Sequence, residues 1–307
     1  MVQGLGADKL AAEGIGRSRD WLLKASDKWH GFGNMAEGFN LLDPIKCTIV
    51  TPGLDLSGKF AKAGIPASIV TKFLAEHGVV VEKTGLYSFF IMFTIGITKG
   101  RWNTLLTALQ QFKDDYDRNA PMWRILPEFC AAHPRYERMG LKELSQAIHE
   151  TYAKGDIARL VTEMYLSDLQ PAMKPSDAFA HIAHRKTERV GIDELEGRIT
   201  TALLTPYPPG IPLLIPGERF NKKIVDYLRF TREFNAAFPG FDTDVHGLVE
   251  DDAPGAARRY YVDCVRTSEI EVAVATPAKP AVKARAKAKA APAAVTAKAP
   301  GRRPSRG

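Results

Sequence analysis

Cysteine is scarce in this sequence. Only Cys47, Cys130 and Cys264 occur among 307 residues, and they lie far apart. Three separated thiols can form neither a disulfide framework nor a CxxC metal site, so we expect reduced, mostly packed cysteines in a cytoplasmic protein. No apolar run reaches the roughly 18 residues that a membrane span needs. The first residues also lack the apolar core of a secretory signal.

General catalytic and metal-binding motifs are missing as well. The sequence contains no GxxxxGK[ST] phosphate loop, no GxGxxG after a strand and no GxSxG elbow. His181 and His184 lie three residues apart on a predicted helix, but no acidic or thiol partner has a suitable spacing. A solvated helix face is therefore favoured over a metal site.

Acidic residues are absent from 272–307, which holds five Lys and four Arg. The whole chain carries a net charge of +7, and subtracting these nine cations leaves −2 for residues 1–271. Residues 271–307 are rich in Ala, Pro and Lys, with little to bury, so we expect a disordered basic tail. The tail is either a solubilising extension or a weak nucleic-acid or polyanion binder that acts through charge, since it has no aromatic side chain for base stacking.

Residues 45–116 alternate between strand and helix patterns, which predicts an α/β or α+β fold. Pro66 is placed to begin the first helix and Gly78 to end it. The expected elements are a strand at 45–51, a helix at 64–78, a buried strand of parallel type at 79–84, a strand at 87–96 and a helix at 98–116.

The second part of the chain is predicted to be mostly helical, with helices at 141–154, 156–166, 175–190 and 221–238 and a final strand at 259–266. Ser176 and Asp177 are candidate N-caps of the third helix. The segment TPYPPGIPLLIPGE, residues 205–218, contains five prolines. Proline fixes an irregular path at low entropic cost, and we expect the aliphatic side chains of the segment to anchor that path in the core.

Two carboxylates stand out. Glu82 ends an apolar run just before a glycine turn, a place where active-site groups occur, and alternation puts it on the same face as Thr84. Glu82 is either a strand-end residue paired with a surface cation or a carboxylate that holds a cationic ligand. Glu218 is more simply explained by the favourable dipole of the helix that follows it.

Six blocks together resemble the Orn/Lys/Arg decarboxylases, bacterial enzymes that use pyridoxal phosphate (PLP). The resemblance covers roughly residues 20–266 in the correct order, and residues 99–121 lean weakly towards the arginine-type members. The blocks are WHGF (29–32), LDPIKCTIVTPG (42–53), GIPASIVTKFL (64–74), GVVVEKTGLYSFFIMFTIG (78–96), LEGRITTALLTPYPPGIPLLIPGE (195–218) and FPGFDTDVHG (238–247).

The resemblance implies the C-terminal half of the family's architecture. We expect an irregular lead at 1–20, the small subdomain of the aspartate-aminotransferase-like PLP fold at 21–118, and the Orn/Lys/Arg decarboxylase C-terminal domain at 119–270. It also implies that Glu82, with Thr84, holds the distal amino or guanidinium group of the substrate. The proline-rich segment would be the signature of the C-terminal domain and would lie against the large domain.

The family's Ser-x-His-Lys motif, whose lysine binds PLP, has no match in the printed sequence. AHRK at 183–186 lies in a different block of the family. We therefore expect no PLP binding by this chain alone. It would contribute substrate recognition and subunit packing to a decarboxylase of arginine, lysine or ornithine. Its partner would be a separate PLP-domain chain or further copies of itself. Alternatively, it is a non-catalytic remnant or an interaction subunit of a full-length decarboxylase.

Deleting residues 272–307 tests the two interpretations of the tail. If the tail binds polyanions, the full chain should bind single-stranded RNA in 50 mM salt, and its affinity should fall by orders of magnitude at about 200 mM. The truncated chain should not bind. Fluorescence anisotropy measures both. Binding that persists in the truncated chain would contradict this interpretation, and no binding by the full chain would favour a solubilising role.

Overall fold

The computed structural model describes residues 26, 43, 45–55, 57–94, 96–207, 210–251 and 259–268. The expected lead at 1–20, the WHGF motif and the expected basic tail with its nucleic-acid contact all lie outside the described residues. The tail's order and binding therefore stay predictions.

The first described part is a small antiparallel sheet with two helices. The strands are arranged in the order β1-β3-β2, and α2 contacts β2, β3 and α3. This order of strands and helices agrees with the prediction for 45–116. The elements are β1 (Lys46–Val50), α2 (Ala67–Glu76), β2 (Lys83–Thr84), β3 (Ser88–Met92) and α3 (Lys99–Asp117).

One face of this sheet is buried. Phe89 and Ile91 on β3 belong to the hydrophobic core, together with Phe73 of α2. Successive side chains of a strand point to opposite faces, and the other face carries the exposed Thr48 and Val50 of β1 and the half-buried Phe90 of β3. The helices therefore cover only one side of the sheet within the described residues.

Residues 79–84 do not form the expected buried parallel strand. Only the last two, β2, are paired, and they run antiparallel to β3. Val80 is 86% exposed. The reason lies at the end of α2, where Gly78 adopts a positive φ and the Val79 N–H donates to the Leu74 carbonyl at 2.8 Å. This turn at the helix end uses the residues that would otherwise extend the strand.

A layer of helices follows, as the sequence predicts. Its elements are α4 (Met122–Ile125), α5 (Pro127–Ala132), η3 (Pro134–Tyr136), α6 (Leu141–Lys154) and α7 (Ile157–Leu166). α9 (Lys222–Ala237) packs on α7. Asn221 caps α9 by accepting from the Ile224 N–H at 3.0 Å, and its amide donates to the Ser167 hydroxyl at 2.8 Å. One side chain thus begins α9 and ties it to the end of α7.

The helix expected at 175–190 is wrong in its second half. α8 (Pro175–Ala183) ends before Arg185, which adopts a positive φ of 56°. Residues Thr187–Gly191 instead form β5, which pairs antiparallel with β10 (Arg259–Val265). Left-handed backbone at a non-glycine residue cannot continue a helix, and pairing with β10 then determines the structure of the following residues.

The expected N-caps of this helix are also wrong. The N-cap of α8 is Lys174, and Pro175 is the first helical residue. Proline suits this position because its missing N–H would have no partner in the first turn. Ser176 and Asp177 consequently lie inside the first turn.

The remaining strands form three small antiparallel sheets, with orders β5-β10-β9, β4-β7 and β6-β8. The predicted final strand is confirmed as β10, whose Val262 and Cys264 are fully buried. The other elements are β4 (Gln170–Pro171), η4 (Ile192–Glu194), β6 (Thr205–Tyr207), β7 (Glu218–Arg219), β8 (Asp244–His246) and β9 (Val249–Asp251).

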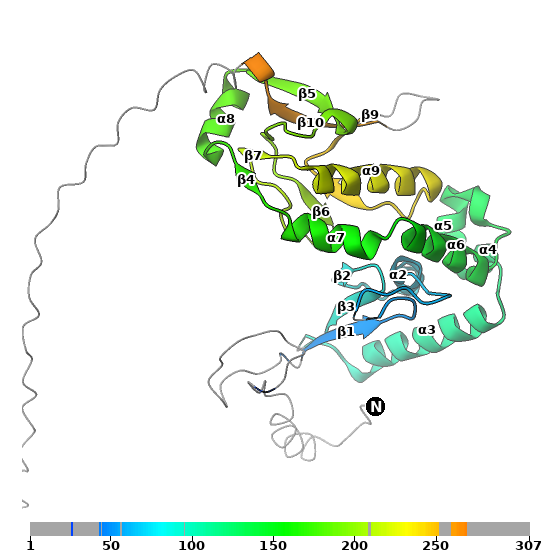
Figure 1. Ribbon diagram of the computed structural model, residues 1–307. Coiled ribbons are helices and arrows are strands. Elements are labelled where there is room, and N and C mark those ends of the chain that lie inside the picture. The colour runs from blue at the N-terminus through cyan, green and yellow to red at the C-terminus, as the bar shows by residue number, and fades with distance from the viewer. Residues whose placement is uncertain are drawn as a thin grey trace, which may run out of the picture.

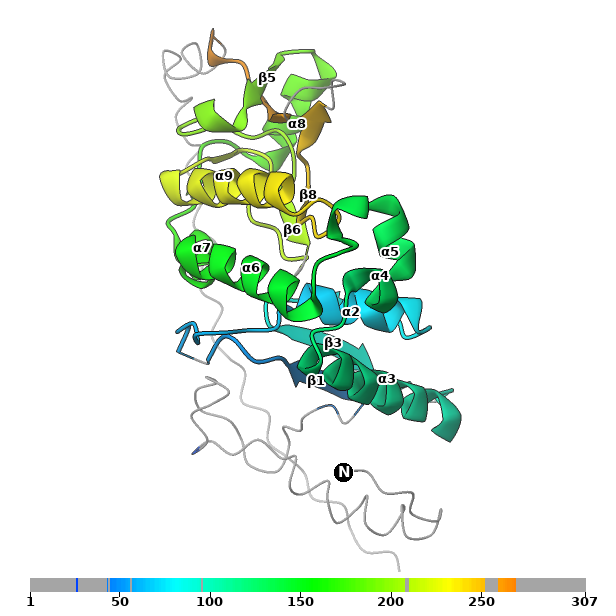
Figure 2. The same ribbon diagram turned by 90° about the vertical axis from the view of Figure 1, so that its right-hand side faces the viewer.

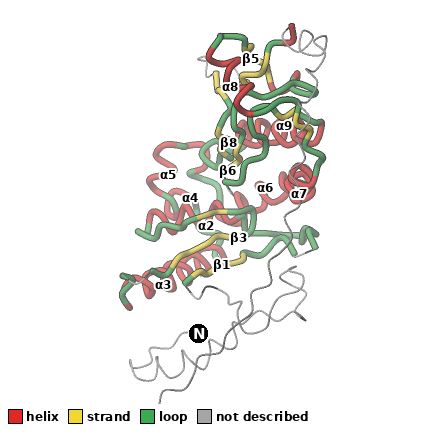
Figure 3. The backbone as a smooth tube through the Cα atoms, turned by 90° about the vertical axis from the view of Figure 1, so that its left-hand side faces the viewer, coloured by secondary structure: helices red, strands yellow, loops and turns green. Residues whose placement is uncertain are grey.

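These parts are stacked along one axis. Figure 1 shows the β1-β3-β2 sheet at one end, α6 and α7 in the middle, α9 beyond them, and β5 and β10 at the far end. The view in Figure 2 gives the same order. Figure 3 separates the strands into groups on either side of the central helices. The helices therefore join the small sheet to the C-terminal strands.

The proline-rich segment is only half buried. Leu213 and Leu214 lie in the core, and Leu214 bridges to Leu204. Ile211 and Ile215 are exposed, so the prediction that all four aliphatic side chains anchor the segment is wrong for these two. Leu213 and Leu214 are held inward by Leu204, whose carbonyl accepts from the Leu213 N–H at 2.7 Å and whose N–H donates to the Leu214 carbonyl at 2.9 Å.

Glu218 closes the proline-rich segment. Its carboxylate accepts from the Ile215 N–H at 2.8 Å, and it lies in β7. The cap of α9 is Asn221, so Glu218 is not its N-cap, and its contribution to the dipole of that helix stays a prediction.

His149 joins the small sheet to the helical layer. This buried side chain of α6 lies between the Tyr87 hydroxyl, 2.6 Å from Nδ1, and the Ala61 carbonyl, 2.9 Å from Nε2. A carbonyl can only accept, so Nε2 carries a proton, and in the neutral ring Nδ1 accepts from the Tyr87 hydroxyl. A Cβ at Gly53 would meet the Tyr87 ring, and one at Gly64 would meet the imidazole. Glycine is therefore required at both positions.

Lys72 makes a second junction. The ammonium of this α2 residue lies 5.1 Å from the ring centroid of Phe129 and 5.4 Å from that of Phe241. Burial lowers the pKa of Lys72, while Asp242 and Glu76 act in the opposite direction. Cation–π contacts to rings from two separate segments fix α2 against the C-terminal part.

Tyr87→Phe tests the His149 junction. It leaves a buried imidazole nitrogen without a donor, so the free energy of unfolding should fall by about 1–3 kcal/mol. Denaturant titration measures this change. Tyr165→Phe is the matched control, because its more exposed hydroxyl bonds to the Ile211 carbonyl. An equal or smaller loss in Tyr87→Phe would show that the junction contributes little.

Candidate functional site

Glu82 lies where the chain enters β2, and its side chain is exposed. Both of its backbone groups are bonded. The N–H donates to the Phe90 carbonyl at 2.9 Å, and the carbonyl accepts from the Tyr207 hydroxyl at 3.3 Å. Among the described residues, none is recorded as a partner of its carboxylate. The site thus presents an anion with a fixed backbone and an accessible head group.

Thr84 lies opposite Phe89 and is half-buried, whereas Lys83 lies opposite Phe90 and is exposed. The two residues therefore face opposite sides of the sheet, as alternation predicts. Thr84 shares the covered face with Phe89. Its hydroxyl is consequently less accessible to a ligand than the Glu82 carboxylate.

Tyr207 is the contact that sequence reasoning missed. It comes from β6, across the junction between the small sheet and the C-terminal strands, and its ring is 45% exposed. The prediction for the proline-rich segment rests on its prolines and its aliphatic residues. Tyr207 is the single aromatic residue of that segment, which was an available signal.

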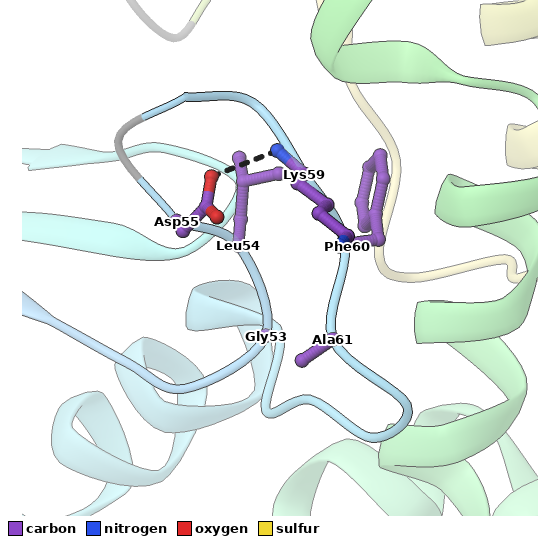
Figure 4. A pocket seen from close by; sticks show the side chains of 6 residues that line it. All are labelled: Gly53, Leu54, Asp55, Lys59, Phe60 and Ala61. Atoms are coloured by element: carbon purple, nitrogen blue, oxygen red, sulfur yellow. Dashed lines mark hydrogen bonds between the residues drawn. The ribbon is translucent and has the colours of Figure 1, made fainter.

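A shallow cavity lies beside this region, in the loop between β1 and α2. Its volume is about 380 Å³, and Figure 4 shows its lining. Phe60 forms one wall, and its ring makes edge contacts with Tyr87 and His149. Neither Glu82 nor Thr84 lines this cavity. The lining residues are Gly53, Leu54, Asp55, Lys59, Phe60 and Ala61.

Asp55 organises this loop internally. Its carboxylate accepts from the Ser57 hydroxyl and the Ser57 N–H, and also from the Lys59 N–H, the bond drawn in Figure 4. The bond from the Ser57 hydroxyl, followed by that from the Lys59 backbone, lowers the pKa of Asp55. These bonds resemble an Asx turn, so the carboxylate stabilises the loop itself.

The described residues do not fit a PLP site. A Schiff-base lysine needs an amine activated by desolvation or by neighbouring cations. Lys59, the lysine at the cavity, is exposed beside Asp55, and the ammonium of Lys72 is engaged by aromatic rings. Lys186 of the AHRK string follows the end of α8 and is also exposed.

Other candidate residues form no site. Among the described residues, no three His, Cys, Asp or Glu are gathered as metal ligands would be. Cys130 and Cys264 are buried, as predicted, and Cys47 is half-buried. Burial raises the pKa of Cys264 to about 12, so its reactive thiolate is rare near neutral pH. No helix in the described part is long and apolar enough to cross a membrane.

Comparison with known proteins gives two family matches. Residues 5–101 match the model described as Orn/Lys/Arg decarboxylase, major domain. Residues 158–266 match the model described as Orn/Lys/Arg decarboxylase, C-terminal domain.

Individual relatives agree. Lysine decarboxylase LdcA of Pseudomonas aeruginosa is 50% identical over 253 residues, which cover 81% of this chain and 34% of that protein. The inducible lysine decarboxylase of Escherichia coli K12 is 41% identical over 74% of this chain and 32% of its own length. The biodegradative arginine decarboxylase of the same strain is 33% identical over 80% of this chain and 32% of its own.

A solved structure of lysine decarboxylase A from Pseudomonas aeruginosa matches with a TM-score of 0.75 and 50% identity, over 81% of this chain and 34% of that one. The mixed helix and strand fold expected from the sequence is thus confirmed. The chain spans about a third of the length of the curated relatives it matches. It belongs to the Orn/Lys/Arg decarboxylase family of PLP-dependent enzymes and represents a partial span of that family's architecture.

Proposed function

We propose that this chain is the C-terminal part of a PLP-dependent decarboxylase of basic amino acids, with lysine as the favoured substrate. The identities of 50% and 41% to lysine decarboxylases, against 33% to an arginine decarboxylase, support lysine. We keep the expected boundaries, with a small subdomain at 21–118 and a C-terminal domain at 119–270.

Glu82 recognises the distal cation of the substrate in this proposal. The observation that carries it is the bonding at Glu82: both backbone groups are engaged, whereas the carboxylate has no recorded partner among the described residues. A carboxylate held in this way can form a charge-assisted hydrogen bond with an ammonium group without first breaking an internal one. Thr84 has a secondary role, since it is only half accessible.

Specificity follows from the placement of this charge. PLP, when bound in a family member, supplies the electron sink for decarboxylation. The contribution of this chain is an anion far from the reacting carbon. A desolvated site that offers such an anion discriminates against amino acids without a distal cation, because the carboxylate would remain unpaired.

Exposed apolar side chains support a role in packing. Leu203, Ile211 and Ile215, all in or next to the proline-rich segment, are 48%, 53% and 42% exposed. Apolar residues gathered on one segment are typical of a contact surface. The partner is a PLP-domain chain or a further copy of this chain. The same observation favours the second candidate function, a non-catalytic interaction subunit of a full-length decarboxylase.

Restoration of activity to a separate PLP domain distinguishes the two candidates. The purified chain mixed with PLP should show no absorbance of a lysine-bound cofactor. A separately produced major domain of a lysine decarboxylase should gain lysine decarboxylase activity when this chain is added. Spectrophotometry and CO₂ release measure the two quantities. Activity of the isolated chain would contradict its assignment as a part that lacks the cofactor lysine, and no gain on mixing would favour the interaction subunit.

Glu82→Gln tests substrate recognition in the combined enzyme. Loss of the charge should raise KM for lysine about 10- to 100-fold, because a hydrogen bond to a charged group contributes about 1.5–3 kcal/mol. Cofactor absorbance should be unchanged.

Glu196→Gln is the matched control, since Glu196 is also exposed but lies in the turn after η4. Steady-state kinetics of both variants measure KM for lysine and so test whether the Glu82 carboxylate recognises the substrate. Equal KM values for Glu82→Gln and the unmodified chain would remove Glu82 from the site.

A further inference from the structure

Two different sheets hold the backbone of Glu82. The Phe90 carbonyl, on β3, bonds to its N–H, and the Tyr207 hydroxyl, on β6, bonds to its carbonyl. A peptide plane is rigid, so bonds to the N–H and to the carbonyl of one residue restrict its φ and ψ. These two angles set the direction of the Cα–Cβ bond. The side chain of Glu82 therefore leaves the backbone in a direction that depends on both contacts.

The contact from β3 cannot fix this direction alone. β2 lies at the edge of its sheet and contains only two paired residues, so few ladder bonds hold it. Edge segments with little pairing open readily. Tyr207 supplies a bond from outside the sheet, at the residue that bears the candidate recognition group.

Tyr207 is itself held in place. It lies opposite Asp244 in the β6-β8 pair, next to Pro206, which lies opposite the buried Val245. Its ring makes an edge contact with the His246 ring, with centroids 6.3 Å apart. The His246 imidazole is in turn 3.4 Å from the Asp244 carboxylate. A side chain with a restricted rotamer can position a second group at little entropic cost.

We propose that Tyr207 is a positioning residue that sets the direction of the Glu82 carboxylate towards the distal ammonium of a basic amino acid. This inference rests on the proposed role of Glu82. It assigns a function to Tyr207, the aromatic residue of the proline-rich segment, through its bond to the residue that precedes β2. Tyr207 acts through the backbone of Glu82 and needs no contact with the substrate.

Tyr207→Phe removes the hydroxyl and keeps the ring. In the full chain, hydrogen exchange at the backbone amides of 79–85 should become several-fold faster, and the melting temperature should change little because Tyr207 is partly exposed. In the combined enzyme, KM for lysine should rise about threefold to tenfold, as expected for one lost hydrogen bond, with less than a twofold change in kcat.

Tyr165→Phe is the matched control. Its hydroxyl donates to the Ile211 carbonyl of the same proline-rich segment at 3.1 Å, but it has no recorded bond to β2. This variant should leave both the exchange at 79–85 and KM unchanged. An equal effect of the two variants would show that loosening of the segment, and not the bond to Glu82, is responsible, and would overturn the proposal.

The exchange measurement separates this inference from the proposed function. Unchanged exchange at 79–85 in Tyr207→Phe overturns the positioning role, whatever the result for Glu82→Gln. Faster exchange with an unchanged KM in Glu82→Gln would mean that Tyr207 holds the backbone but that Glu82 does not recognise substrate, which overturns both the proposed function and the role of Tyr207 in recognition.

Discussion

The pair of hydrogen bonds made by the His149 imidazole is the interaction on which the rest of the arrangement depends. One ring nitrogen accepts from Tyr87 in the small sheet, and the other donates to the Ala61 carbonyl in the loop before α2. The bond to Tyr87 is buried and the bond to Ala61 is partly buried, so losing either one leaves a nitrogen of the buried imidazole without its partner, at a cost in stability. The ring thereby fixes α6 against the small sheet. α7 follows α6 in the chain, and α9 packs on α7.

This constraint explains how residues from distant parts of the sequence meet. Glu82 and Tyr207 are separated by 125 positions, yet a hydrogen bond joins them. Glu82 comes from the small sheet and Tyr207 from β6, and the helical layer joins the two parts of the chain that carry them. The Lys72 contacts with Phe129 and Phe241 act in parallel with His149, so two independent junctions keep the parts in one register.

Local patterns predicted much of the fold, whereas long-range contacts did not follow from them. The helix at 221–238 was predictable because its apolar residues recur with helical spacing. The sequence pattern predicts helix for residues 187–191. The pairing of β5 with β10, some 70 residues later, leaves no local signal, so the pattern does not reveal this strand. For the site, Glu82 could be selected from its place at the end of an apolar run, but its bond to Tyr207 crosses two sheets and depends on the junction at His149.

The close approach of Gly53 and Gly64 has a consequence for the loop between them. An added Cβ on Gly53 would come within 2.9 Å of the Gly64 Cα, so the two backbones touch where the loop begins and ends. Between these glycines, the Asp55 carboxylate accepts from the N–H groups of Ser57 and Lys59. A loop whose ends meet in this way can differ in length or composition without displacing β1 or α2. Its tip is accordingly a natural place to graft an epitope or an affinity tag.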